Sequence, residues 1–208
     1  MISVGTDATQ FSDCEPGVRE VPVLQCLYSG HMGRLHDWET LGAALRPGVP
    51  QGVNITIASD GPSANALKSH LQNTCHERLS FSGTRQSVDW KATMLGADVA
   101  LVTMLPGAEK VVMPSKTYSA MAAGQAVLAI CPDQSDLADL IKTHDCGWVI
   151  EPGDARNLRT LLEGLPQRSA EVHKKRINSY NAAHAHYSME STSRQWLKLF
   201  GELNEHSS

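Results

Sequence analysis

Residues 113–132 read MPSKTYSAMAAGQAVLAICP, and a turn, a helix and a strand follow one another here with almost no loop. Ser115 stands where a helix N-cap is expected, because its hydroxyl can accept a hydrogen bond from one of the first N–H groups of the helix. The Ala-rich segment after it favours a helix, and Gly124 is the residue type that commonly follows a last helical turn. The apolar run at 126–132 then predicts a buried strand.

The alternation of strand and helix continues on both sides of this stretch. Apolar or β-branched runs predict strands at 21–30, 53–61, 78–83, 98–105, 126–132 and 147–152. Segments with apolar residues on one face predict helices at 36–46, 62–75, 87–97, 115–124, 134–144 and 154–165, followed by 167–187 and 190–204. The pattern predicts an α/β fold: a single Rossmann-like, doubly wound parallel sheet of about six strands, covered by helices.

We divide the chain into three parts on this pattern. Residues 1–20 are polar, contain glycine and proline, and are interpreted as a linker or extended arm. Residues 21–165 hold the strand–helix alternation, and 166–208 hold the C-terminal helices. A chain of 208 residues is long enough for one large domain with a sizeable core.

Composition limits the classes of function. Apolar residues make up 41% of the chain and charged residues 19%, which is ordinary for a soluble globular protein. The net charge of -4 predicts no nucleic-acid partner. We expect no membrane-spanning helix and no signal peptide, because no long apolar run occurs. The five widely spaced cysteines contain no C-x-x-C pair, and a reducing, cytoplasmic setting is the simplest interpretation.

The loops that leave the predicted strands form the candidate site, because ligands of doubly wound sheets bind at the carboxyl ends of strands, near the point where strand order reverses. The first loop, 29–36, contains Gly30, Gly33 and Arg34. A glycine directly after a strand lets the backbone approach a ligand, and arginine pairs well with phosphate. By itself, this loop is equally well interpreted as a glycine turn with a surface arginine.

Two further loops carry similar residues. Gly83 and Arg85 follow the strand at 78–83, although a surface arginine is locally the simpler interpretation. Lys116 falls in the first turn of a predicted helix, where a cation opposes the helix dipole unless an anion binds there. The Ser115 hydroxyl, the helix N–H groups and the Lys116 ammonium would converge on a phosphate. The alternative is a solvated Lys116 beside an alanine run that belongs to the core.

Other chemistry finds little support in the sequence. His184 and His186 are spaced i, i+2 and fall on different faces of a helix, so no metal site is expected. The chain contains no G-x-S-x-G elbow, no Walker motif and no G-x-G-x-x-G fingerprint. Carboxylates near strand ends show no paired spacing that indicates an acid and a base.

Five stretches, in their order and spacing, resemble the C-terminal, donor-binding half of the GT-B fold in group 1 (family 4-type) glycosyltransferases. They are LYSGHMGRLHDWETLGAAL, ITIASDGP, LSFSGTRQSVDWKATMLGADVALVTM, PSKTYSAMAAGQAVLAI and CGWVIEPGDARNLRTLLEGL. The bacterial subgroup with a PSK-x-Y-x-x-M-A-A-G signature, seen in exopolysaccharide and O-antigen enzymes, is most similar. Residues 2–11, ISVGTDATQF, are also similar to the linker that enters this domain in the family.

The resemblance implies that the domain binds a nucleotide diphosphate sugar, UDP- or GDP-linked, without a cofactor. The donor-binding residues that it implies are Gly30, Gly33 and Arg34 near the diphosphate, Gly83, Thr84 and Arg85 around the base, and Ser115 and Lys116 near phosphate and ribose.

The chain departs from the family pattern at several of these positions. Many relatives have a Glu-x7-Glu motif whose second glutamate holds the ribose hydroxyls; Val111 and Ser119 stand at those positions here. His31 and His36 align with the usual arginine and lysine after the first strand. Ser119 therefore remains a candidate donor-binding residue, but recognition of the ribose by a carboxylate is not expected.

The resemblance implies the donor half of a retaining, metal-independent glycosyltransferase acting on a polysaccharide or lipid-linked acceptor. GT-B enzymes bind the acceptor on an N-terminal domain, which this sequence does not contain. Three explanations for its absence are a truncated gene, one subunit of a split enzyme and a domain without catalysis. A separate acceptor-binding domain or subunit is therefore an expected partner.

The alternative functions are a non-catalytic nucleotide- or partner-binding module and a GT-B-like epimerase. The implied location is the cytoplasm, with at most peripheral contact at the inner membrane face.

Overall fold

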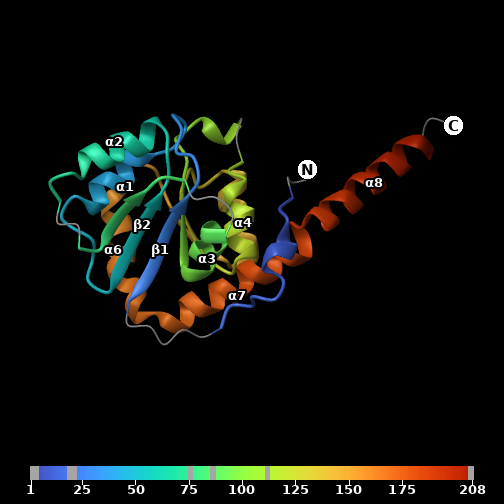
Figure 1. Ribbon diagram of the computed structural model, residues 1–208. Coiled ribbons are helices and arrows are strands. Elements are labelled where there is room, and N and C mark those ends of the chain that lie inside the picture. Colours follow the sequence, from blue (N-terminus) through green and yellow to red (C-terminus); the bar gives the residue numbers. More distant parts are fainter. Residues whose placement is uncertain (1–4, 18–22, 75–76, 85–87, 111–112, 206–208) are drawn as a thin grey trace.

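The computed structural model describes residues 5–17, 23–74, 77–84, 88–110 and 113–205 (Figure 1). The strands are β1 (Leu24–Ser29), β2 (Val53–Ala58), β3 (Leu79–Ser82), β4 (Val99–Thr103), β5 (Ala126–Ile130) and β6 (Gly147–Ile150). The helices are α1 (Trp38–Leu45), α2 (Pro62–His70), α3 (Val88–Gly96), α4 (Lys116–Ala122), α5 (Asp136–His144), α6 (Ala155–Gly164), α7 (Ser169–His186) and α8 (Met189–Glu205). Short 3-10 turns are η1 (Ala8–Phe11), η2 (Ala108–Lys110) and η3 (Leu165–Gln167).

The six strands form one sheet in the order β3-β2-β1-β4-β5-β6, and every neighbouring pair is parallel. The chain builds outward from β1 to β3 and then returns to place β4 beside β1. The direction of winding therefore reverses between β1 and β4, which is where such a sheet opens a crevice for ligands. The predicted parallel α/β sheet of about six strands is confirmed.

Helices cover both faces of the sheet, as Figure 1 shows. Helices α1, α2 and α6 pack on one face, and α3, α4, α5 and α7 on the other. Each face of the sheet therefore has its own hydrophobic core. Within β4, the Leu101 side chain packs in the core under α1, α2 and α6, whereas Ala100 and Val102 pack in the core on the other face, because alternate residues of a strand point to opposite faces. All residues of β4 and β5 are buried, as expected for central parallel strands.

Helix α4 ends as its sequence predicts. Gly124 has a φ of 70°, and its N–H donates to the carbonyl of Met121 at 2.9 Å. The N–H of Gln125 donates to the carbonyl of Ala120 at 3.0 Å. These two bonds make a Schellman motif, in which a residue without Cβ adopts the left-handed conformation most easily.

The start of α4 differs from the prediction that the Ser115 hydroxyl caps it. Ser115 itself has helical backbone angles, φ −57° and ψ −28°, and its side chain makes no capping bond. A side chain caps a helix from an extended backbone, which Ser115 does not have. Instead, the carbonyls of Pro114 and Ser115 accept hydrogen bonds from the N–H groups of Thr117 and Tyr118, at 3.0 and 3.2 Å.

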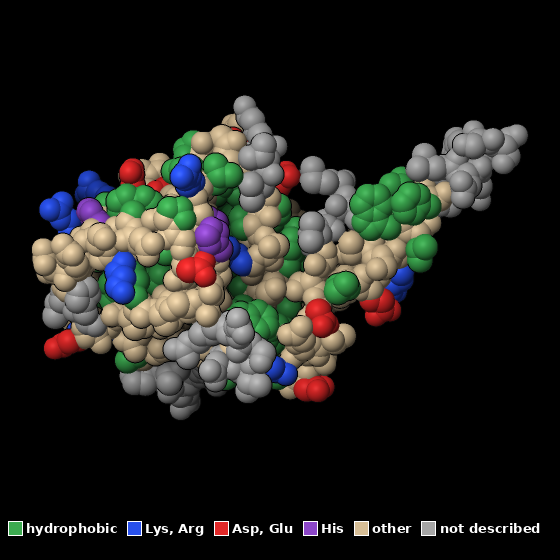
Figure 2. Space-filling view, turned by 45° about the horizontal axis from the view of Figure 1, so that its top comes forward, with side chains coloured by type: hydrophobic (Ala, Val, Ile, Leu, Met, Phe, Trp, Pro, Cys, Tyr) green, Lys and Arg blue, Asp and Glu red, His purple; other side chains and the backbone are tan. Residues whose placement is uncertain are grey.

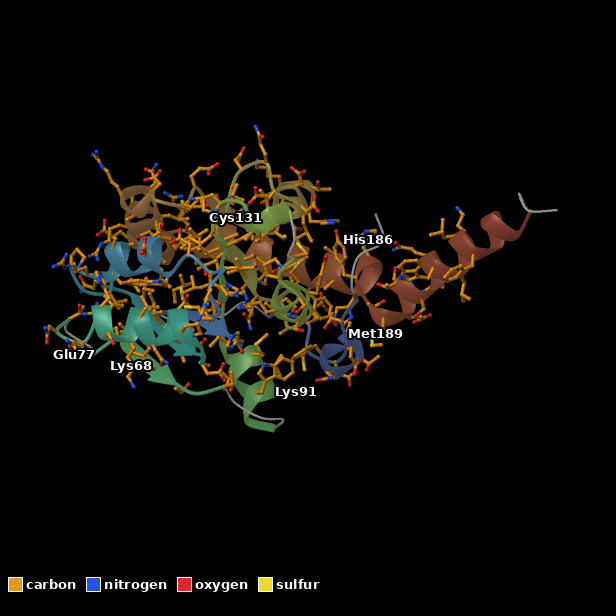
Figure 3. All side chains as sticks on the ribbon, turned by 90° about the horizontal axis from the view of Figure 1, so that it is seen from above. Lys68, Glu77, Lys91, Cys131, His186 and Met189 are labelled. Atoms are coloured by element: carbon orange, nitrogen blue, oxygen red, sulfur yellow. The ribbon has the colours of Figure 1, made fainter. Side chains whose placement is uncertain are left out.

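The described part of the N-terminal segment packs on the domain at the junction of α7 and α8. The Thr6 N–H donates to the carbonyl of Tyr187 at 2.8 Å, and the Thr6 carbonyl accepts from the N–H of Met189 at 2.9 Å. Phe11 is buried, with its ring centroid 5.7 Å from that of Trp90. Figure 3 shows Met189 beside this segment, at the base of α8.

Helix α8 projects from the rest of the domain (Figure 1). Hydrophobic side chains gather on the projecting helix in Figure 2. The large ones that are exposed are Met189, Trp196, Leu197, Leu199 and Phe200. Within the described ranges, no helix has the length and apolar content needed to cross a membrane.

Candidate functional site

A cavity of about 490 Å³ lies at the switch point between β1 and β4. Its walls come from the loop after β1, the first turns of α4, one side of α3 and the N-terminal segment. Of the predicted site residues, Gly30, Ser115, Lys116 and Ser119 line it. The sheet order thus brings together two of the loops that the sequence singles out.

Lys116 connects α4 to the end of β1. Its ammonium donates to the Tyr28 hydroxyl at 2.6 Å and to the carbonyl of His31 at 3.0 Å. Tyr28 is fully buried, and Lys116 is half-buried. The lysine is therefore held in the cavity wall and does not extend into solvent.

The charge of Lys116 has no matching anion in the described part of the chain, where no carboxylate forms an ion pair with it. Burial lowers the pKa of Lys116 to about 7, because the charged form loses hydration without gaining a counter-ion. An anionic ligand in the cavity would reverse this effect.

The groups next to Lys116 are neutral at pH 7. Burial, together with the nearby Lys116 charge, lowers the pKa of His36 to about 4. The His36 Nδ1 lies 2.7 Å from the carbonyl of Thr103, so the ring donates to it. Burial raises the pKa of Tyr28, whose hydroxyl lies 3.2 Å from the same ring nitrogen. Neither side chain supplies the negative charge that Lys116 lacks.

Asp60 joins the loops that follow β1, β2 and β3. Its carboxylate lies 2.7 Å from Nδ1 of His31 and accepts a hydrogen bond from the Thr84 hydroxyl at 2.7 Å. These bonds, that of His31 first, lower the pKa of Asp60. Gly61 makes the approach possible: it has a φ of 106°, and an added Cβ would lie 2.6 Å from the His31 ring. Asp60 thereby orients the loop whose carbonyl binds Lys116.

The remaining predicted residues that the structure describes do not line the cavity. Arg34 is exposed, and the carbonyl of Gly33 accepts a hydrogen bond from the Ser63 hydroxyl at 2.9 Å. Gly83 and Thr84 are exposed, and the Thr84 hydroxyl donates to the Asp60 carboxylate. Arg85 and Val111 fall outside the described residues.

Several residues that line the cavity were not among the site residues predicted from the sequence. Thr6 lines the cavity from the N-terminal segment, and Trp90 and Met94 line it from α3. Tyr28, the buried partner of Lys116 behind the cavity wall, looks in the sequence like one more apolar residue of a strand. Trp90 and Met94 have the i, i+4 spacing of an ordinary core-facing helix stripe, which carries no signal for a ligand. Asp60 does not line the cavity, and its place directly after a strand is the sequence signal that could have pointed to its role in holding the His31 loop.

Comparison with known proteins identifies the family. Residues 25–166 match the family model described as glycosyl transferases group 1. The chain belongs to the group 1 glycosyltransferases. It is 28% identical over 139 residues to the probable glycosyltransferase WbjE of Pseudomonas aeruginosa, an alignment that covers 66% of this chain and 34% of WbjE. The group 1 glycosyltransferase chain therefore spans about a third of this curated relative.

Solved structures support the same assignment at the level of the fold. The C-terminal domain of LpcC, a group 1 glycosyltransferase from Francisella tularensis, matches with a TM-score of 0.67 and 14% identity, covering 89% of this chain and 100% of that domain. Anabaena HepE, solved in complex with UDP-glucose, matches with a TM-score of 0.70 and 17% identity, covering 95% of this chain and 56% of HepE. The six-stranded parallel sheet is thus that of the C-terminal GT-B domain.

Proposed function

We propose that this group 1 glycosyltransferase domain binds a nucleotide diphosphate sugar, UDP- or GDP-linked, in the cavity between β1 and β4. It would act as the donor half of an enzyme that transfers the sugar to a polysaccharide or lipid-linked acceptor. The observation that carries the proposal is Lys116, a half-buried cation in the cavity wall with only neutral hydrogen-bond partners among the described residues. A diphosphate supplies the missing charge.

The cavity suits such a ligand in its size and in the residue types that line it. Its volume of about 490 Å³ is in the range of small-molecule sites. Lys116, Ser115 and Gly30 are among the lining residues and would supply the contacts to phosphate. Trp90 and Met94 also line it and would supply apolar contacts for a base. The HepE complex with UDP-glucose is consistent with a donor site in this fold.

The proposal extends to partners and location. An acceptor-binding domain or subunit is the expected partner, since the chain matches about half of HepE and a third of WbjE. The similarity to the PSK-x-Y-x-x-M-A-A-G subgroup supports a polysaccharide or O-antigen pathway. A cytoplasmic location follows from that chemistry, with peripheral contact at the inner membrane face when the acceptor is lipid-linked.

Calorimetric titration with UDP and GDP, and with ADP for comparison, tests the donor site. We expect UDP or GDP to bind, with Lys116→Met weakening it by about tenfold or more, because charge-assisted hydrogen bonds to phosphate are lost. The matched control is Lys91→Met on α3, where the lysine is exposed (Figure 3). Absence of binding at millimolar nucleotide, or equal affinity in both variants, would overturn the proposal.

The second candidate is a nucleotide-binding module without catalysis. Ser119 favours it, since this cavity residue has a hydroxyl where many relatives have a carboxylate. Both candidates bind nucleotide, and they differ in turnover. Release of UDP from UDP-glucose by the domain with its acceptor-binding partner, lost in Lys116→Met, supports the transferase; binding without release supports the module.

A further inference from the structure

The cavity beside Lys116 extends along the whole length of α4. Ser115 and Lys116 line it at the start of the helix, and Gln125, which directly precedes β5, lines it beyond the end of the helix. The seven residues of α4 alone span about 10 Å, at a rise of about 1.5 Å per residue. The cavity therefore has an outer end at the carboxyl edge of the sheet, where Lys116 lies, and an inner end near Gln125, toward the amino edge.

The inner end of the cavity is formed by four buried residues, which are Met94 of α3, Ala100 of β4, Ala120 of α4 and Gln125 itself. The small side chains of Ala100 and Ala120 keep this end open between the sheet and α4. Met94 and the two alanines offer apolar side chains to a ligand. The amide of Gln125 is therefore the polar side chain of the inner end.

The Gln125 amide presents an acceptor to the cavity and no donor. Its Nε2 donates to the carbonyl of Met94 at 2.7 Å, which fixes the orientation of the amide group. Its Oε1 is buried and has no hydrogen-bond partner among the residues that the structure describes. A buried acceptor of this kind destabilises the folded protein unless a donor reaches it. The inner end therefore suits a ligand that carries an N–H donor on an otherwise apolar surface.

A nucleotide base has this character. We propose that Gln125 selects the base of the nucleotide, with its Oε1 accepting a hydrogen bond from a ring N–H. Uracil carries this donor at N3 and guanine carries it at N1, whereas the corresponding nitrogens of cytosine and adenine carry a lone pair. That lone pair would face the lone pairs of Oε1, because turning the amide over to donate would break its bond to Met94. Trp90 and Met94 supply apolar contacts to the ring.

The inference depends on where the phosphates bind. It rests on the proposed function, namely that a nucleoside diphosphate binds with its phosphates at Lys116, from where the base extends along α4 toward Gln125. The resemblance in sequence places Gly83, Thr84 and Arg85 around the base. Gly83 and Thr84 do not line the cavity, and Arg85 falls outside the described residues. Gln125, which no motif in the sequence indicates, is thus a base contact inside the cavity.

Calorimetric titration of the wild-type protein with UDP and CDP, and with GDP and ADP, tests this inference. The two members of each pair match in ring size and differ at the ring nitrogen that would face Gln125. In the pair that binds, we expect UDP or GDP to be favoured about tenfold or more, because a base without the N–H leaves the buried Oε1 unpaired. Gln125→Met, which keeps the length of the side chain and removes the acceptor, should bring this ratio of affinities close to one.

The matched control is Gln134→Met, because Gln134 is exposed before α5, does not line the cavity and should not affect the ratio. Lys116→Met should weaken both members of a pair by the same factor. A wild-type ratio close to one, which is measured even if Gln125→Met does not fold, would overturn this inference, and so would a ratio that persists in Gln125→Met. In both cases binding that still depends on Lys116 leaves the donor site intact. A wild-type protein that does not bind UDP or GDP would overturn both proposals.

Discussion

The Lys116 ammonium lies 2.6 Å from the Tyr28 hydroxyl, which joins the first turn of α4 to the last part of the central strand β1. A cation in this place opposes the helix dipole and is poorly hydrated. The order of winding reverses between β1 and β4, so this poorly hydrated charge lies in the wall of the cavity at the switch point.

Binding of UDP should take up a proton near pH 8. The free protein holds Lys116 with a pKa of about 7, so the amine is mostly neutral at pH 8. A diphosphate beside it favours the charged form and raises its pKa toward the ordinary value of 10.5. Calorimetry in buffers of different ionisation enthalpy should therefore show uptake approaching one proton. The uptake should vanish at pH 5.5, where Lys116 is already charged, and in Lys116→Met at pH 8; uptake in that variant would assign it to another group.

Lys116 should make the unliganded protein more stable as the pH rises from about 7 to 10. In that range the unfolded chain still binds the lysine proton, whereas the folded protein has released it. The free energy of unfolding therefore rises with pH for wild type relative to Lys116→Met. We expect the variant to be at least as stable as wild type at pH 6 and to lose that advantage at pH 9.5. Urea denaturation at both pH values measures this, with Lys91→Met as control; a constant difference between wild type and Lys116→Met would contradict it.

Asp60→Asn should weaken UDP binding by several-fold. The substitution removes the charged acceptor that holds His31 and Thr84, and the carbonyl of His31 is a partner of Lys116. Stability should change little, because Asp60 is exposed at a loop. Titration of UDP measures the effect, and Asp133→Asn, an exposed carboxylate paired with Lys142, is the control. Equal affinities in the two variants would show that Asp60 does not position the site.

Gly5→Ala should destabilise the domain by about 1 kcal/mol or more, because the added Cβ overlaps α8. It would lie 2.7 Å from the Thr192 Oγ1 and 3.1 Å from the backbone of Met189. The control is Gly17→Ala in the same segment, where nothing lies within 4 Å of an added Cβ. Thermal unfolding compares the two. If the melting temperature falls equally in both, the close packing of Gly5 on α8 is not what holds the segment.

The sequence predicted the local structure of this protein well. Apolar runs of strand length and one-sided helical stripes located the strands and helices, because burial imposes these periods on each segment separately. The glycine at position 124 correctly predicted the end of α4, because the positive φ needed there depends on the type of a single residue. Ser115 did not cap α4, because a cap depends on the backbone angles of the residue before the helix, which residue type alone does not determine.

The sequence by itself also determined that a cation stands at the start of α4, close to the carboxyl ends of strands. Only the tertiary structure decided which groups surround it. Tyr28 meets Lys116, and Thr6 meets Ser119, across 88 and 113 positions of the chain. Such contacts follow from the placement of β4 beside β1 and of the N-terminal segment against α8. The period of apolar residues in a segment indicates which side chains are buried. Their partners depend on which loops the strand order brings to the same edge of the sheet.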